Sequence, residues 1–193
     1  MRYSPDHKKQ TRERIVRAAA RHVRQKGTKG PGIADLMGKL ELTHGGFYKH
    51  FRNKQQLLAE AIVQGFDETE TWLAETLGKA EPGSELKMII ERYLSLQHCS
   101  DLAGGCPVAA LASEIARFPR AMRVHVDRAI RKRIRLISKF LPGSTDVERQ
   151  RNCLVLFSGM AGALSLARAS VDLQSRRAIL KASREFYIRA FCN

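Results

Sequence analysis

Apolar residues recur at intervals of three and four positions along almost the whole chain, which is the spacing of one face of an α-helix. No stretch shows the strict alternation of apolar and polar residues that indicates a β-strand. Glycine and proline interrupt the helical pattern at Gly27, Pro82-Gly83, Gly104-Gly105 and Pro142-Gly143. The pattern therefore predicts an all-α protein of about nine helices. Their expected ranges are 8–26, 33–40, 44–51, 54–79, 85–98, 106–118, 119–141, 145–170 and 173–191.

Residues 32–51, GIADLMGKLELTHGGFYKHF, contain two short helical patterns separated by a turn of about three residues. Phe47, Tyr48 and Phe51 follow helical offsets in the second pattern, and Thr43 stands where it can cap that helix. Two short helices joined in this way are typical of a helix-turn-helix, whose second helix enters the major groove of DNA.

Small and polar residues occupy the exposed side of the second helix and the positions just after it. Two adjacent glycines allow the backbone to approach DNA closely. The residues expected to contact DNA are Thr43, His44, Gly45, Gly46, Tyr48, Lys49, His50 and Lys54. Among them we expect Thr43 and His44 to contact bases, and Lys54 to contact a phosphate.

The string THGGFYKHFRNKQQLLAEAI resembles the end of the DNA-binding domain of the TetR family, and TRERIVRAAARHVRQKG resembles its first helix. Together they cover roughly residues 8–62. The resemblance implies a DNA-binding domain over residues 1–56, with its helix-turn-helix at 32–51, and an effector-binding and dimerisation domain over 57–193. Two positions depart from the family: Glu41 replaces the usual glycine of the turn, and Pro31-Gly32 replaces a hydroxyl-bearing pair before the first short helix.

The charge of the chain fits a polyanion partner. Lys and Arg number 34 against 19 Asp and Glu, and residues 1–56 hold 14 basic and 4 acidic side chains. The excess of positive charge is therefore concentrated around the helix-turn-helix. A second run, 117–139, holds nine basic residues and one acid, Asp127. It is either a further anion-binding surface or the solvated face of an amphipathic helix, and the second interpretation is favoured.

The remaining composition narrows the function class. The four cysteines lack zinc-ligand spacing, so we expect free thiols and no metal. The N-terminus lacks an apolar signal core, and no apolar run approaches the roughly 20 residues of a membrane span, so we expect a cytoplasmic protein. Nucleophile, phosphate-loop and metal-pair motifs are missing from the sequence, so we expect neither an enzyme nor a cofactor.

A cysteine stands at the predicted start of a helix in GGCPVAALASEIAR, residues 104–117. The stretch resembles the NemR-like branch of the TetR family, whose members sense electrophiles and hypochlorite, although Pro107 distinguishes this chain. The positive end of a helix dipole favours a reactive thiolate at Cys106, with His98 and Cys99 nearby across the loop. The alternative is that Cys106 is a small buried apolar residue.

The other candidate effector-binding residues could instead have purely structural roles. Glu114 is a lone carboxylate on a helix of small residues, which suits a buried polar or ligand-contacting role. Trp72, Tyr93 and Phe157 are spaced as core residues, and core aromatics can also line a pocket between helices.

Small residues in the last two predicted helices allow close helix packing. From the resemblance we expect a homodimer that uses these helices, with Gly159, Ala163 and Leu166 in the interface. The predicted function is a repressor that a small effector or a thiol-reactive signal releases from a palindromic operator. The alternative is a small-molecule-binding or stress protein with non-specific DNA affinity. The sequence leaves open the effector, the operator and the choice between repression and activation.

Overall fold

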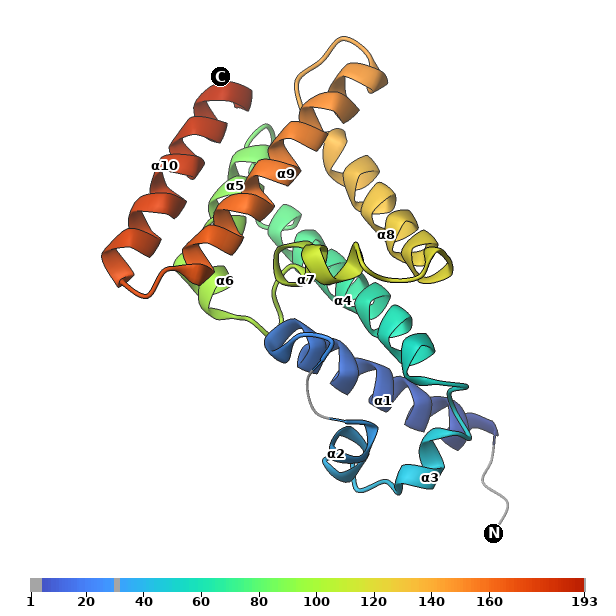
Figure 1. Ribbon diagram of the computed structural model, residues 1–193. Helices are drawn as coiled ribbons and strands as arrows, with labels where there is room; N and C mark the ends of the chain where they lie inside the picture. The colour runs from blue at the N-terminus through green and yellow to red at the C-terminus, as the bar shows by residue number, and fades with distance from the viewer. Residues whose placement is uncertain (1–4, 30–31, 193) are drawn as a thin grey trace.

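Ten helices and no strand are found in residues 5–29 and 32–192, the part of the chain that the computed structural model describes (Figure 1). The helices are α1 (Pro5–Lys26), α2 (Ile33–Gly38), α3 (His44–Phe47), α4 (Lys54–Leu77), α5 (Glu85–Tyr93), α6 (Leu96–Ser100), α7 (Pro107–Ile115), α8 (Arg120–Ser138), α9 (Asp146–Ala169) and α10 (Leu173–Phe191). The all-α prediction is confirmed. The additional helix arises where the predicted helix over 85–98 breaks, because Ser95 caps a new helix by accepting a hydrogen bond from the His98 N–H at 3.1 Å.

The three N-terminal helices pack around aromatic and aliphatic side chains. Phe47 and Phe51 are buried and stack with ring centroids 5.3 Å apart. Thr43 caps α3 as predicted, since its Oγ1 accepts the Gly46 N–H at 3.2 Å. Glu41 adopts a φ of 59°, so the departure from glycine in the turn is accommodated by a residue in the left-handed region. Helix α3 is shorter than the predicted 44–51 and continues as turns.

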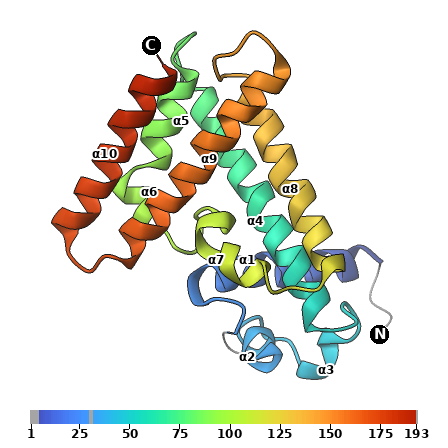
Figure 2. The same ribbon diagram turned by 45° about the horizontal axis from the view of Figure 1, so that its top comes forward.

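Helix α4 connects the two ends of the molecule. It packs on α1, α5 and α8. The views in Figures 1 and 2 place α1, α2 and α3 at one end and the antiparallel pair α9 and α10 at the other. The predicted boundary at residues 56 and 57 falls in the first turn of α4 and stays a prediction. Pro31, one of the two departures from the family pattern, lies outside the described residues.

The interior consists of two apolar clusters along α4. The first joins α1, α3 and α4 to Leu111 of α7 and Val126 of α8. The second joins α4, α5, α8, α9 and α10 around Ile90, Leu156 and Met160. Since α7 and α8 contribute to the first cluster, the N-terminal helices rest directly on the C-terminal part of the chain.

Helix α9 is long and apolar enough, by length and composition, to cross a membrane. The expectation that no apolar run approaches this length is therefore wrong. In the apolar 18-residue stretch of α9, 39% of the stretch is buried inside the subunit, where the helix packs on α7, α8 and α10. Helices in the core of a soluble protein can have the same length and apolar composition, so one such helix is weak evidence for a membrane span.

Candidate functional site

The helix-turn-helix presents a compact polar surface. Thr43, His44 and Lys49 are exposed, and the Tyr48 side chain is 61% exposed. The rings of His44 and Tyr48 pack edge to face with centroids 5.9 Å apart. No atom lies within 4 Å of a Cβ placed on Gly45, so a groove surface can approach its backbone. This arrangement suits the predicted contacts with bases and phosphates.

His50 and Lys54, like Gly46, are half-buried, whereas the other predicted DNA contacts are exposed. Burial, followed by the positive charges of Lys8, Arg12 and Lys49, lowers the pKa of His50. The lowered pKa favours the neutral ring, and the predicted contact of His50 with DNA stays a prediction. Lys54 begins α4, beyond the Asn53 cap, where its charge lies near the end of the recognition segment.

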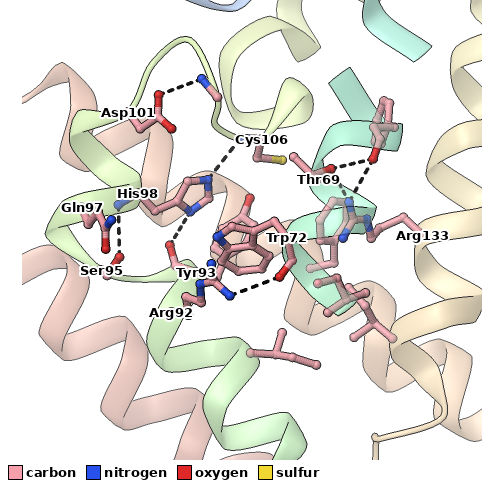
Figure 3. Close-up of a pocket in the computed structure, with 16 residues that line it drawn as sticks. Thr69, Trp72, Arg92, Tyr93, Ser95, Gln97, His98, Asp101, Cys106 and Arg133 are labelled. Carbon is pink, nitrogen blue, oxygen red and sulfur yellow. Dashed lines mark hydrogen bonds between the residues drawn. The ribbon is translucent and has the colours of Figure 1, made fainter. Parts of the chain in front are cut away.

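A cavity of about 140 Å³ lies between α4, α5, the α6–α7 loop and α8 (Figure 3). Five of the seven predicted effector residues line it: Trp72, Tyr93, His98, Cys106 and Phe157. Cys99 is buried outside the lining, and Glu114 faces the N-terminal helices. The structure therefore brings together residues from four separate predicted helices at one hollow.

His98 and Cys106 are joined by a hydrogen bond that fixes the start of α7. The Cys106 N–H donates to His98 Nε2 at 3.1 Å, and His98 Nδ1 lies 2.7 Å from the Tyr93 carbonyl oxygen. A neutral ring protonated on Nδ1 satisfies both contacts. Burial lowers the pKa of His98 to about 4, which also favours the neutral ring. Because Nε2 accepts the backbone N–H, His98 positions Cys106 and does not serve as a base for its thiol.

The thiol of Cys106 is enclosed. The residue is 5% exposed and stands at the N-cap of α7, with Pro107 in the first turn as predicted. Gly105 precedes it at a position that excludes a side chain, since a Cβ there would lie 2.6 Å from the Asp101 carbonyl oxygen and also meet Arg168. Arg168 of α9 donates to the His98 carbonyl at 3.0 Å and to the Cys99 carbonyl at 3.2 Å, which holds the end of α6. The thiol is thus reached through the cavity.

Two arginines that the sequence analysis did not single out complete the cavity. Arg133 of α8 is buried and donates to the Phe66 carbonyl at 3.3 Å and to the Thr69 hydroxyl. Arg92 lies over the Trp72 ring, with 4.6 Å from its guanidinium carbon to the ring centroid. A signal for Arg133 was present: it lies seven residues after Val126 and four before Ile137, within the apolar stripe of α8.

Helix α7 links the cavity to the DNA-binding end. It starts at Cys106, and near its other end the Glu114 carboxylate accepts the Thr28 N–H at 2.8 Å and the Thr28 hydroxyl. Thr28 follows Gly27, which ends α1 with a φ of 77° as predicted. Glu114 therefore clamps the α1–α2 connection and has a role between the two parts rather than in ligand contact.

Arg24 of α1 makes a second link that sequence reasoning missed. Its side chain is buried, donates to the Ala103 carbonyl at 2.6 Å and pairs with Glu68 of α4. Ala103 belongs to the loop that supplies Asp101 and Gly104 to the cavity. A Cβ on Gly65 would lie 2.5 Å from an Arg24 nitrogen, so the missing side chain in α4 makes room for this contact. The sequence spacing does not distinguish this buried arginine from the many exposed arginines of the same helix.

The predicted interface residues fall on two faces of α9. Gly159 lies against Tyr187 of α10 and Ala163 packs on the second apolar cluster, both within the subunit. Leu166 is 59% exposed. It belongs to an exposed stripe of apolar and small residues at helical spacing, here called the α9 stripe: Leu154, Val155, Ser158, Gly162 and Leu166.

Comparisons with known proteins support a regulatory role. Residues 15–61 match the sequence model of the bacterial regulatory proteins of the tetR family. An uncharacterized HTH-type transcriptional regulator of Mycobacterium tuberculosis is 32% identical over 105 residues, and the chain spans about half of that relative, 52%. The HTH-type transcriptional repressor NemR of Escherichia coli is 26% identical over 147 residues, which cover 75% of this chain and 71% of NemR.

Solved structures share the fold. The reduced form of E. coli NemR has a TM-score of 0.74 at 22% identity and covers 91% of this chain and 96% of its own. A TetR transcriptional regulator of Chloroflexus aurantiacus has a TM-score of 0.75 at 24% identity, with 95% of each chain covered. These matches extend the likeness from the helix-turn-helix to the arrangement of the C-terminal helices.

Proposed function

Because this chain belongs to the TetR family of helix-turn-helix transcriptional regulators, we propose that it is a homodimeric repressor whose C-terminal cavity receives the releasing signal. The signal is either a small effector or a thiol-reactive compound. The N-terminal domain, residues 1–56, holds the operator, and residues 57–193 bind the effector and the second subunit.

The operator contact uses the exposed surface of α3 and the residues around it. Thr43 and His44 face outward at the start of the helix and read bases, while Tyr48, Lys49 and Lys54 hold phosphates. His50 supports the recognition segment from the protein side. The positive charge concentrated in residues 1–56 adds a salt-dependent attraction to any duplex.

The second subunit covers the α9 stripe and the neighbouring exposed face of α10. Phe186 of α10 is 56% exposed and shares its face with the exposed residues Ala178 and Ala182. Contiguous exposed apolar surface of this kind is typical of protein interfaces. A two-fold dimer then places two recognition helices on the half-sites of a palindromic operator.

One observation carries the link between cavity and DNA: α7 begins at the cavity and ends on the α1–α2 connection. Cys106 is held by His98 at one end, and Glu114 holds Thr28 at the other. A change in the cavity that moves the start of α7 also moves the clamp on α1. The effector acts by favouring the subunit arrangement in which the recognition helices no longer fit successive major grooves.

Thiol chemistry is the first form of the signal to test. Oxidation or alkylation adds atoms to Cys106 inside a cavity of about 140 Å³, beside Tyr93 and His98. Operator binding is measured by fluorescence anisotropy before and after hypochlorite or a quinone. The proteins are the wild type, Cys106→Ser and the matched variant Cys192→Ser.

We expect the wild type and Cys192→Ser to release DNA and Cys106→Ser to remain bound. Release of Cys106→Ser to the same extent would refute the thiol switch and leave reversible occupancy of the cavity as the signal. The rival function, a small-molecule-binding or stress protein with non-specific DNA affinity, predicts binding of every duplex with equal affinity and a steep salt dependence.

A further inference from the structure

The cavity contains a buried positive charge that makes no ion pair. The carboxylate that acts on it, Glu70, lies outside the lining and pairs with Lys132 at 2.7 Å. Arg133 is 6% exposed, and within the described part of the chain no carboxylate lies within ion-pairing distance of its guanidinium. Burial lowers the pKa of Arg133, yet a guanidinium remains charged under physiological conditions. A buried charge without a counter-charge is costly, so an anion in the cavity would be strongly favoured.

A second donor points to the same ligand class. The Tyr93 hydroxyl is buried beside the Cys106 thiol and bonds to no oxygen or nitrogen of the described residues. Burial, and then the neighbouring Cys106, hold the pKa of Tyr93 well above its ordinary value, so the hydroxyl stays protonated and can donate. Figure 3 shows Tyr93 of α5 and Arg133 of α8 converging on the cavity from different elements.

The other charged residues of the lining, one arginine and one acid, leave the inner part of the cavity positively charged. Arg92 also lines it and donates to the Thr76 hydroxyl at 2.5 Å, while Glu75 lies 3.5 Å away on the outer side. The described lining has one carboxylate, Asp101, which is exposed on the α6–α7 loop and accepts the Gly104 N–H at 2.7 Å. The acid thus lies at the rim. The interior has the buried guanidinium of Arg133 and the phenol of Tyr93, whereas Arg92 is half-buried and pairs with Glu75.

The walls between these donors are apolar and aromatic. Trp72, Phe66 and Phe157 contribute rings, and Leu73, Ile89 and Ile137 contribute aliphatic groups. The volume of about 140 Å³ is close to that of an engineered protein cavity of about 150 Å³ that holds one benzene molecule. A single six-membered ring therefore fits without rearrangement of the walls.

We propose that the cavity binds a small aromatic carboxylate, a single ring carrying one negative charge, with the carboxylate at Arg133 and Tyr93 and the ring against Trp72. This inference rests on the proposed function, because it names the class of effector that the cavity takes. A neutral ring would leave Arg133 without a counter-charge. An inorganic anion would leave the apolar walls unfilled.

The chain contains one tryptophan, and it lines the cavity, so intrinsic fluorescence reports on occupancy. The titration compares benzoate with benzamide, its neutral analogue, and with benzylamine, a cation of similar size. We expect benzoate to change Trp72 emission and to bind about 10- to 100-fold more tightly than benzamide, the range for hydrogen bonds to a charged group. Benzylamine should give no saturable change.

Two variants locate the anion contact. Arg133→Gln and Tyr93→Phe should each weaken benzoate binding by about tenfold or more, because each removes a hydrogen bond to the charged carboxylate. Arg131→Gln is the matched control, because Arg131 lies on the same helix but is exposed and paired with Asp127. Tyr93→Phe removes a hydroxyl that bonds to no oxygen or nitrogen of the described residues and lies beside the Cys106 thiol, so this variant should fold even if Arg133→Gln does not.

Equal binding of benzoate, benzamide and benzylamine would overturn the proposal, and so would unchanged benzoate affinity in Tyr93→Phe and in a folded Arg133→Gln. The same preparations are tested for protection of a specific duplex without benzoate. Failure of benzoate binding with intact protection would refute the ligand class and leave the proposed function standing. Benzoate binding without a protected duplex would refute the proposed function instead.

Discussion

Acidification should destabilise this protein through His98. In the folded chain this ring is neutral, bonded to the Tyr93 carbonyl and to the Cys106 N–H, and its pKa is lowered to about 4. In the unfolded chain a histidine titrates near 6.5. The unfolded state therefore takes up the proton first as the pH falls. The contribution of His98 to stability is complete above about pH 6.5 and is lost between there and pH 4.

The size of the effect follows from these two pKa values. Proton linkage between about 6.5 and about 4 gives a loss of roughly 2 kcal/mol in the free energy of unfolding between pH 7 and pH 5. A change of 1 kcal/mol shifts the melting temperature of a chain of this size by about 2 to 4 °C. The expected fall in melting temperature from this one ring is therefore about 4 to 8 °C.

The assay is urea unfolding at pH 7, 6 and 5 with the protein concentration held constant. His98→Gln keeps an acceptor near the Cys106 N–H and removes the titrating ring. His125→Gln is the matched control, because His125 is exposed on α8. Burial also lowers the pKa of His22 and His50, but both titrate in every variant and cancel in the comparison. The same loss between pH 7 and pH 5 in the wild type and in His98→Gln would refute this reasoning.

Three further substitutions test separate parts of the structure. Lys54→Ala should weaken binding to all duplexes and lower the slope of log affinity against log salt by about 1. Lys79→Ala should change neither the affinity nor the slope. An unchanged slope in Lys54→Ala would mean that the domain docks differently. Leu166→Arg should place a charge in the proposed apolar dimer interface, so sedimentation should show monomers and operator binding should be lost. Val171→Arg, in the exposed loop, should stay dimeric. A dimeric Leu166→Arg would place the interface elsewhere. Gly65→Ala should lower the free energy of unfolding by about 1 to 3 kcal/mol because its Cβ would meet Arg24. Gly78→Ala, at the end of the same helix, should leave this free energy unchanged or raise it. A change of the same sign in both variants would contradict the packing at Arg24.

Sequence periodicity predicted most of the fold because amphipathic helices have a local signature. The last helix has the predicted bounds, Leu173–Phe191, and the cap at Thr43 follows from residue type. The positive φ at Glu41 could be anticipated only from the resemblance, because the family usually has glycine there. The break between α5 and α6 was missed because Leu94 continues the apolar stripe. A cap at Ser95 can be recognised once the break is known, but serine is also tolerated inside helices.

The candidate site was predicted in part. Cys106, His98 and Trp72 were expected near a pocket, from the helix start and the resemblance, but their convergence depends on how four helices pack. Arg133 was grouped with its exposed neighbours, since a basic run is usually solvated. For Glu114 a buried polar role and a ligand-contacting role were both left open, because the sequence cannot show that the α1–α2 connection passes beside it.

A dimer of this chain should recognise one operator sequence rather than DNA in general. The most direct measurement is a footprint of the purified protein across genomic DNA at physiological salt with competitor DNA present. We expect protection of a short inverted repeat, with half-sites separated by about one helical turn, that persists as competitor is added. Uniform binding that disappears with rising salt and leaves no protected repeat would contradict it.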